Sequence, residues 1–253
     1  MNKILQLILV LSCCAQANTW IHVGYFYPND TKNRFGSDSA TAADIAAKHA
    51  FAQTSFKRSG TQTRLGGAKI ARINSGITSE SVTLDQMYDF IDNFRTTHVW
   101  PYQNSQSRIR WDWGKSGRNY ANRNNLSLAC FVSPLSSGSA YGQVYDRFSL
   151  VKYNNTGATY AHELAHNFTV FHQTGGYVRN DEDADLNDTQ FYASNLDNNK
   201  RTSMGSYNLQ LRIARFSNPN KNYSGYPYGT ADRNNAAVMR GTRTNVRSYR
   251  GTW

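Results

Sequence analysis

The chain of 253 residues has few cysteines and lacks an apolar run long enough to span a membrane. Its cysteines are Cys13, Cys14 and Cys130, and the first two lie in the N-terminal region. Removal of that region leaves Cys130 alone and excludes an intramolecular disulfide. The apolar stretch 126–132 around Cys130 favours a buried strand, in which this thiol packs in the core and does not react.

The N-terminal region has the pattern of a secretory signal peptide. Lys3 precedes the apolar run 4–11, and Ala-Gln-Ala at 15–17 is a small-x-small cleavage site. We therefore expect residues 1–17 to be a signal peptide and the mature protein to be secreted. The segment ending at Cys13 is also similar to a bacterial lipoprotein box, so an acyl anchor at Cys13 is the alternative.

Acidic residues are scarce as well. Asp and Glu number 17 against 28 Lys and Arg, which gives a formal net charge of +11 and indicates affinity for anionic surfaces. Two arginines and two tryptophans occur together at 108–113, the composition of single-stranded nucleic-acid sites, but a solvated strand or loop is favoured there and no nucleic-acid partner is expected. The dense acidic patch 181–185 lacks the spacing of a calcium loop, so a solvated loop is favoured and bound Ca²⁺ is the alternative.

No internal repeat and no linker interrupts residues 18–253, which are enough for one domain with its own core. Hydrophobic periodicity and end signals predict a mixture of helices and strands, so the fold class is α+β. Asparagine-rich stretches at 119–125 and 181–199 are predicted to be surface loops. The predicted strands are 20–27, 69–74, 126–133 and 147–152. The predicted helices are 41–57, 83–95, one that starts near 157, and 232–240.

The segment 162–172 places three imidazoles and one carboxylate at spacings that suit a metal ion. On an α-helix, His162 and His166 share a face and lie about 6 Å apart along the axis, within reach of one ion. Glu163 projects in a neighbouring direction, where it can touch a metal-bound water. Ten residues of helix would carry His172 about 15 Å past His162, so the helix must end soon after His166.

Three neutral imidazoles leave the fourth position of a zinc ion open, and the ion lowers the pKa of a water there to roughly 7. We therefore expect Zn²⁺ on His162, His166 and His172, with Glu163 as the base that takes the proton and passes it to the leaving amine. The sequence thus predicts a secreted zinc endopeptidase that acts on protein or peptide substrates. The other histidines are expected to be structural or exposed: His22, His49 and His98.

The pattern His162-Glu163-x-x-His166-x-x-Thr169-x-x-His172, followed by Met204, resembles the metzincin clan of zinc endopeptidases. In that clan a methionine turn lies beneath the metal, and Ser203-Met204-Gly205 is similar to it. The resemblance covers nearly the whole chain after residue 17 and is strongest at 158–172. Further segments similar to secreted bacterial and reprolysin-like members are 21–27, 139–161, 215–219 and 235–238.

The resemblance implies a zincin-like α+β fold. A mixed twisted sheet with a backing helix and the zinc helix would form an upper subdomain at about 18–170. A smaller, mostly irregular or helical lower subdomain would follow at about 171–253, with the cleft between the two. Met204 would form a hydrophobic floor under the ligands and take no part in the chemistry.

Three positions depart from the clan pattern. Glycine is usual where Thr169 stands, because the turn out of the helix requires a positive φ. Either this turn is built differently or strain is stored at the site. Gln173 after the third histidine matches none of the usual subfamily residues, so no subfamily is assigned. Clan members with a metal-linked tyrosine have it two residues after the turn methionine. Here Tyr207 comes three residues after Met204, so both a catalytic role and ordinary packing remain open for it.

Two other functions remain open. Few residues separate the expected cleavage point from the first strand, and a layout without a prosegment is similar to the proteolytic A subunits of some enterotoxins. A partner subunit is not identified by the sequence. Alternatively, Thr169 and Gln173 mark a degenerate metal site, and the protein is a secreted basic binding module.

Overall fold

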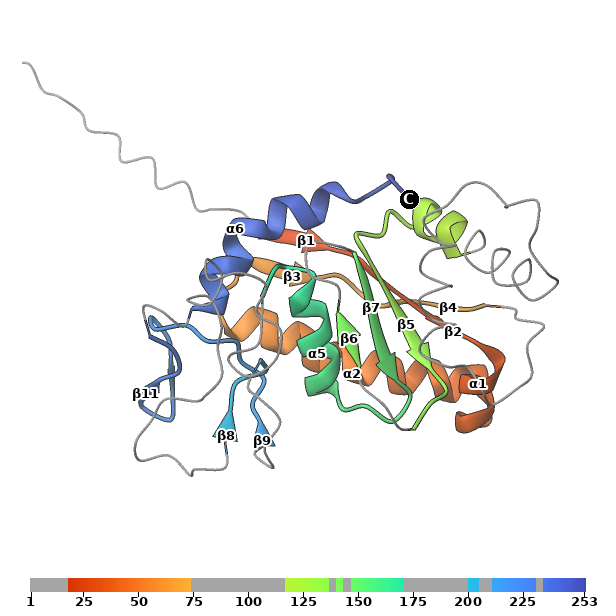
Figure 1. Ribbon diagram of the computed structural model, residues 1–253, viewed down its shortest axis with the longest axis horizontal. Helices are drawn as coiled ribbons and strands as arrows, with labels where there is room; N and C mark the ends of the chain where they lie inside the picture. The colour runs from red at the N-terminus through yellow and green to blue at the C-terminus, as the bar shows by residue number, and fades with distance from the viewer. Residues whose placement is uncertain are drawn as a thin grey trace, which may run out of the picture.

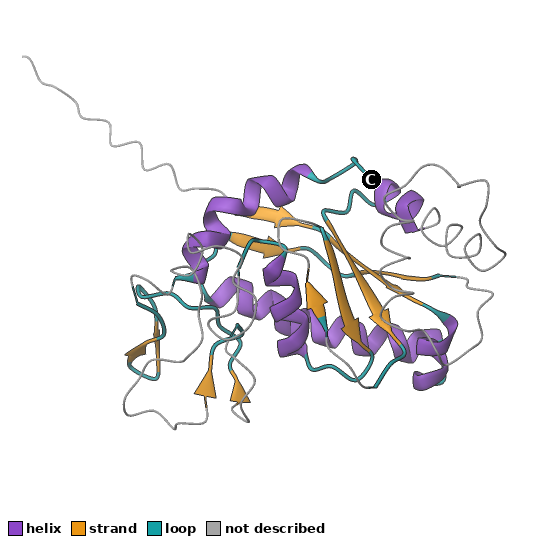
Figure 2. Ribbon diagram, viewed as in Figure 1, coloured by secondary structure: helices purple, strands orange, loops and turns teal. Residues whose placement is uncertain are grey.

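The computed structural model describes residues 18–73, 117–136, 140–142, 147–170, 200–204, 211–230 and 234–253. Within these ranges, helices and strands surround a five-stranded sheet (Figures 1 and 2). The mixed helical and stranded composition predicted from the sequence is confirmed. The same residues contain no helix with the length and apolarity needed to cross a membrane. The expected signal peptide, the helix at 83–95 and the loop at 181–199 lie outside the described residues.

The central sheet is mostly parallel, with the strand order β4-β2-β5-β7-β6. The first four strands in this order run parallel, and β6 is antiparallel to β7. Nearly all residues of the middle strands are buried, as is typical of a parallel sheet covered on both faces. The strands are β2 (Val23–Tyr27), β4 (Lys69–Arg72), β5 (Leu128–Ser133), β6 (Tyr141–Gly142) and β7 (Phe148–Lys152).

One face of the sheet is covered by two helices, α2 (Asp38–Arg58) and α5 (Gly157–His166), and its side chains join the main hydrophobic core. Tyr25 and Cys130 are register partners on β2 and β5, and both point into this core. The predicted burial of Cys130 is confirmed, and desolvation raises the pKa of its thiol to about 12. At that pKa the thiol is protonated at neutral pH.

Close packing of α2 against α5 depends on a glycine. A Cβ added at Gly157 would lie 2.6 Å from the Cβ of Phe51 on α2, closer than two carbon atoms approach. Any larger residue at position 157 would push the two helices apart. Because α5 starts at this contact, the position of the whole helix depends on it.

The opposite face of the sheet has its own, smaller core. It includes Phe26 and Phe131 from the sheet and Ala121 from a helical segment at 117–123. The predicted loop at 119–125 is therefore wrong in its first part, because Ala121 is fully buried there and holds the segment against the sheet. Trp253 closes the edge of this core and donates its indole N–H to the carbonyl of Leu126 at 2.8 Å.

The single strand predicted at 20–27 is wrong in its continuity. It divides at His22 into β1 (Thr19–Ile21), which pairs with β3 (Thr63–Leu65), and β2 of the main sheet. The carbonyl of His22 accepts hydrogen bonds from Ser127 and Leu128 at 2.8 and 3.1 Å. The chain leaves one sheet and enters the other at this residue.

The last helix, α6 (Asn235–Ser248), is longer than the predicted 232–240. It begins where the Asn234 side chain accepts the N–H of Ala237 at 3.1 Å. It continues through Gly241 because Val246 is buried in the main core, which offsets the cost of about 1 kcal/mol for glycine in a helix. α6 packs on β1 and β3 (Figure 1).

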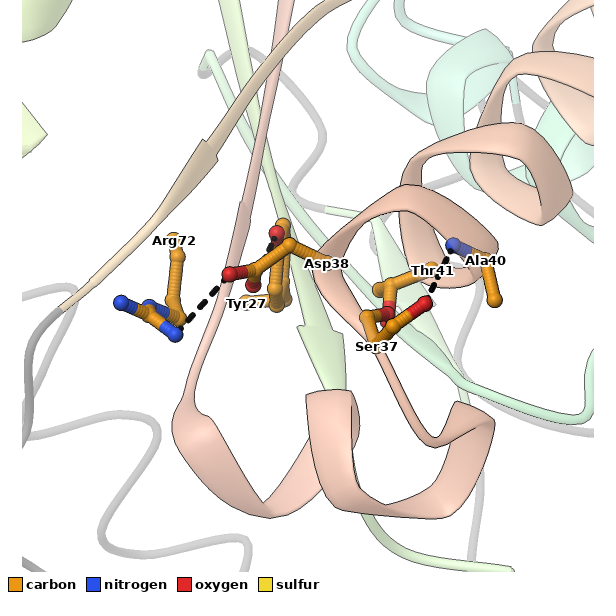
Figure 3. A network of polar contacts seen from close by, with 6 residues as sticks. All are labelled: Tyr27, Ser37, Asp38, Ala40, Thr41 and Arg72. Carbon is orange, nitrogen blue, oxygen red and sulfur yellow. Dashed lines mark hydrogen bonds and ion pairs between the residues drawn. The ribbon is translucent and has the colours of Figure 1, made fainter.

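The N-terminus of α2 is joined to the ends of two strands by polar contacts (Figure 3). The Ser37 hydroxyl accepts the N–H of Ala40 at 3.1 Å and caps the helix. Asp38 accepts the Tyr27 hydroxyl from β2 at 2.9 Å and Arg72 from β4 at 3.0 Å. These contacts fix the backing helix relative to the sheet. The predicted helix at 41–57 is thereby confirmed, with an earlier start.

Candidate metal centre

Helix α5, which carries the two histidines, is fixed at both ends. The Thr156 hydroxyl accepts the N–H of Thr159 at 3.4 Å and caps its start, close to the predicted position. At its end, the Asn167 side chain donates to the carbonyl of Phe148 on β7 at 2.8 Å. The expectation that the helix ends soon after His166 is confirmed, because α5 stops at that residue.

The rings of His162 and His166 converge on one point. Their Nε2 atoms are 3.3 Å apart, and the ring planes are perpendicular, with centroids 4.8 Å apart. Both rings are buried, with 3% and 6% of their surface exposed. The spacing of four residues therefore brings the two imidazoles together, as the sequence predicts.

Each of the two rings is oriented by a backbone carbonyl. Nδ1 of His162 lies 2.9 Å from the carbonyl oxygen of Ser203, and Nδ1 of His166 lies 2.6 Å from that of Val170. A carbonyl oxygen only accepts hydrogen bonds, so each Nδ1 carries the proton. In the neutral rings both Nε2 atoms then present lone pairs toward each other. A cation shared by the two atoms removes this repulsion, and imidazole nitrogen is a ligand that zinc prefers.

Glu163 completes the cluster. One ligand atom from each of His162, Glu163 and His166 lies within 4.8 Å of the others. The carboxyl group is 5% exposed, and desolvation raises its pKa from 4.5 to about 8, against an opposing effect of Arg212. A carboxyl with such a pKa takes up and releases protons near neutral pH, which suits a general base and acid.

In the turn after α5, Thr169 has the positive φ that is expected for a glycine at this position. Its φ is 64°, so the turn has the left-handed conformation that usually takes glycine, and a β-branched residue occupies it. Of the two alternatives, stored strain is the one observed. The chain turns back far enough for Val170 to bond His166. His172, the third expected ligand, lies outside the described residues, and so does Gln173.

Met204 and its neighbour connect this turn with a later part of the chain. Met204 is fully buried in the core that also contains residues of α5. Ser203, whose carbonyl holds His162, donates its own N–H to Arg215 at 2.6 Å and its hydroxyl to Ile213 at 3.2 Å. Ser203 and Met204 therefore lie next to α5 and are attached to residues 213–215. Tyr207 lies outside the described residues.

Sequence reasoning missed Arg212. It ends strand β9 (Leu211–Arg212), far from the zinc motif in sequence, yet it interacts electrostatically with Glu163. No periodicity or spacing signals such an approach, because it depends on how residues 203 and 213–215 pair. The acidic patch at 181–185 and the segment at 108–113 lie outside the described residues.

Two other histidines lie outside the cluster, as expected. His49 on α2 is buried, with Nε2 2.6 Å from the Gly66 carbonyl and Nδ1 2.8 Å from the Tyr25 hydroxyl. Desolvation lowers its pKa and the Gly66 hydrogen bond partly opposes this, so His49 is a neutral structural residue. His22 lies at the junction of β1 and β2. His98 lies outside the described residues.

No protein-family model matches the chain, and no curated protein matches it. Function is therefore inferred from the geometry of His162, Glu163 and His166.

Proposed function

We propose that this chain is a zinc-dependent endopeptidase. One observation carries the proposal: two buried imidazoles turn their Nε2 atoms toward each other beside a buried carboxyl group. The ring of His49, by contrast, lies between the Tyr25 hydroxyl and the Gly66 carbonyl and faces no second histidine. The arrangement of His162 and His166 instead suits a shared cation, with the carboxyl of Glu163 in position to handle protons.

His162 and His166 would hold the zinc ion, with His172 proposed as the third ligand. Bound zinc supplies a Lewis acid that lowers the pKa of water and polarises a carbonyl group. Glu163 takes the proton of the attacking water and delivers it to the leaving nitrogen. Ser203 and Val170 keep the two rings in the tautomer that leaves Nε2 available.

The metzincin resemblance extends the proposal to the rest of the chain. We propose a metzincin-like arrangement, in which Met204 packs beneath the ligands and the cleft lies between the sheet domain and the later residues. The burial of Met204 and its neighbour's hydrogen bond to His162 support this layout. Secretion after removal of residues 1–17 and contact of the basic chain with anionic surfaces are parts of the same proposal.

The test combines metal content with peptide cleavage. We expect purified protein to contain about one zinc per chain and to cleave casein, with activity lost to chelators. Glu163→Gln should keep the zinc and lower turnover about a hundredfold or more, because general acid and base catalysis contributes at least that factor. His172→Ala should lower the zinc content.

Two outcomes would contradict the proposal. Casein cleavage by Glu163→Gln at the wild-type rate would remove Glu163 from the chemistry. A protein that binds zinc but cleaves nothing in a broad peptide library would instead fit the binding module with a degenerate metal site. Circular dichroism of each variant establishes that its fold is intact, so that loss of activity is not loss of structure.

A further inference from the structure

The turn that follows α5 is closed by two hydrogen bonds to one residue, His166. Thr169 donates its N–H to the carbonyl of His166 at 2.9 Å, and the carbonyl of Val170 lies 2.6 Å from Nδ1 of the His166 ring. The helix end, the turn and the ring of a proposed ligand therefore form one unit. The orientation of the ring depends on where this unit places the carbonyl of Val170.

The closed turn contains a strained residue. Thr169 has φ = 64°, and a β-branched residue in this region costs free energy. Such a conformation persists only where the surrounding structure holds it in place. Contacts from outside the turn are therefore needed to keep it as it is. Two side-chain hydrogen bonds reach the two residues between His166 and Thr169, one at each.

The first of these contacts is made by Asn167, which follows His166 directly. Its side chain is buried, and Nδ2 donates to the carbonyl of Phe148 at 2.8 Å. Phe148 begins β7, which lies between β5 and β6 in the central sheet. Asn167 therefore attaches the end of α5 to the interior of the sheet.

The acceptor of this hydrogen bond is itself fixed. The ring of Phe148 lies against that of Trp253, with centroids 5.7 Å apart. The guanidinium of Arg147 lies 4.5 Å from the centroid of the Trp253 ring and donates to the carbonyl of Thr252 at 3.0 Å. The start of β7 is thus covered by residues 252 and 253, so Asn167 is bonded to a rigid part of the sheet.

The second contact comes from Thr242 on α6. Its hydroxyl lies 2.9 Å from the carbonyl of Phe168 and 3.0 Å from that of Val238, so its single proton is shared between the two acceptors. The ring of Phe168 is fully buried, with its centroid 5.3 Å from that of Phe56 on α2. Phe168 is therefore held by its ring and by its carbonyl. In Figure 1 the end of α5 lies below α6.

We propose that Asn167 and Thr242 are positioning residues, which act through the turn to keep the ring of His166 aligned for zinc. The inference rests on the proposed zinc site, and neither residue belongs to the proposed ligand set. A ligand that is oriented in advance loses little freedom when the metal binds, so less of the binding free energy is spent on ordering it. Without the two hydrogen bonds the strained turn relaxes, and zinc must order it again.

The experiment measures the Kd of Zn²⁺ for the full chain by competition with a chelating dye. Loss of a group that orients a ligand lowers metal affinity about tenfold or more, so we expect this change in Asn167→Ala and in Thr242→Val. Thr242→Ser keeps the hydroxyl and should keep the wild-type affinity. Thr31→Val is the matched control, because it removes an equally buried hydrogen bond, to the carbonyl of Val132 at 2.8 Å, from α1 (Asn29–Phe35). It should leave the Kd unchanged.

Zinc affinity separates positioning from a structural role. Urea denaturation identifies conditions in which each metal-free variant is fully folded, and in these a loss of stability alone leaves the Kd unchanged. An equal loss of affinity in Thr31→Val would mean general destabilisation and would overturn the inference. Should Asn167→Ala fail to fold, the pair Thr242→Val and Thr242→Ser decides alone.

The outcomes also distinguish this inference from the proposed function. Wild-type protein that binds no zinc overturns both. Wild-type protein that binds zinc while Asn167→Ala and Thr242→Val bind it with the same Kd leaves the zinc site intact and overturns the positioning role. A Thr242→Ser variant as weak as Thr242→Val would show that the hydroxyl is not the group that matters, and it would overturn the role of Thr242.

Discussion

Thr169 donates its backbone N–H to the carbonyl of His166 at 2.9 Å, and it does so with φ = 64°. This hydrogen bond follows the end of α5, where the chain turns back so that the carbonyl of Val170 reaches the ring of His166. The left-handed conformation suits glycine, and a β-branched side chain adopts it only with strain. The turn after α5 is therefore less stable than the same turn with glycine.

We expect Thr169→Gly to raise the free energy of unfolding by about 1 kcal/mol, because relief of strain exceeds the added entropy of glycine in the unfolded chain. Urea denaturation measures the change. Ser224→Gly is the matched control, since Ser224 also has positive φ (51°) but is exposed and not β-branched. It should give a smaller gain. A Thr169→Gly variant less stable than the parent would show that the side chain stabilises the turn.

The raised pKa of Glu163 predicts how the metal-free protein responds to pH. Between about 4.5 and about 8, the unfolded chain loses this proton while the folded protein keeps it, so the free energy of unfolding falls as pH rises. Below this window both states are protonated, and above it the loss is constant. The full effect is on the order of 5 kcal/mol.

Glu163→Gln removes this dependence. With chelator present, the variant should gain stability over the parent as pH is raised from 5 to 8, measured as the difference in urea midpoints multiplied by the slope. At pH 5 the two proteins should differ little from this cause. A stability difference that is the same at both pH values would show that Glu163 ionises normally in the folded protein.

Much of the site follows from local sequence. The helical period alone places His162 and His166 on one face, and the need to bring in a third ligand requires the helix to end after His166. Strands β5 and β7 follow from their apolar runs. These features depend on residues close together in the chain, so a single sequence is enough to predict them.

Features set by distant pairing were not predictable. The sequence around His22 shows no break between the two strands, and the division appears only in the hydrogen bonds from Ser127 and Leu128 to the carbonyl of His22. The end predicted for the last helix at residue 240 was too early, because burial of Val246 in the core extends α6 to Ser248. Arg212 reaches Glu163 only because Ser203 pairs with Ile213. Tertiary contacts decide each of these cases.

Zinc binding should stabilise the folded protein. A ligand at one hundred times its Kd adds about 2.7 kcal/mol, which raises the Tm of a domain of this size by roughly 5–10 °C. We expect this rise in wild-type protein and not in His166→Gln, measured by differential scanning calorimetry after chelator treatment. His22→Gln, the same change outside the cluster, should keep the rise. An equal zinc-dependent rise in all three proteins would place the metal elsewhere.

Two neighbouring tyrosines in the main hydrophobic core should respond in opposite ways to loss of the hydroxyl. The rings of Tyr25 and Tyr160 lie 5.7 Å apart, and both are fully buried. The Tyr25 hydroxyl donates to Nδ1 of His49, because Nε2 of that ring donates to the carbonyl of Gly66. The Tyr160 hydroxyl has no hydrogen-bond partner among the described residues.

Tyr25→Phe leaves Nδ1 of His49 buried without its donor, so we expect the free energy of unfolding to fall by about 1–3 kcal/mol. Tyr160→Phe removes a hydroxyl that was desolvated without compensation, so stability should stay the same or rise slightly. Urea denaturation of both variants at neutral pH gives the comparison within one protein core. Equal losses for the two variants would mean that the hydrogen bond to His49 contributes nothing beyond the packing of the ring.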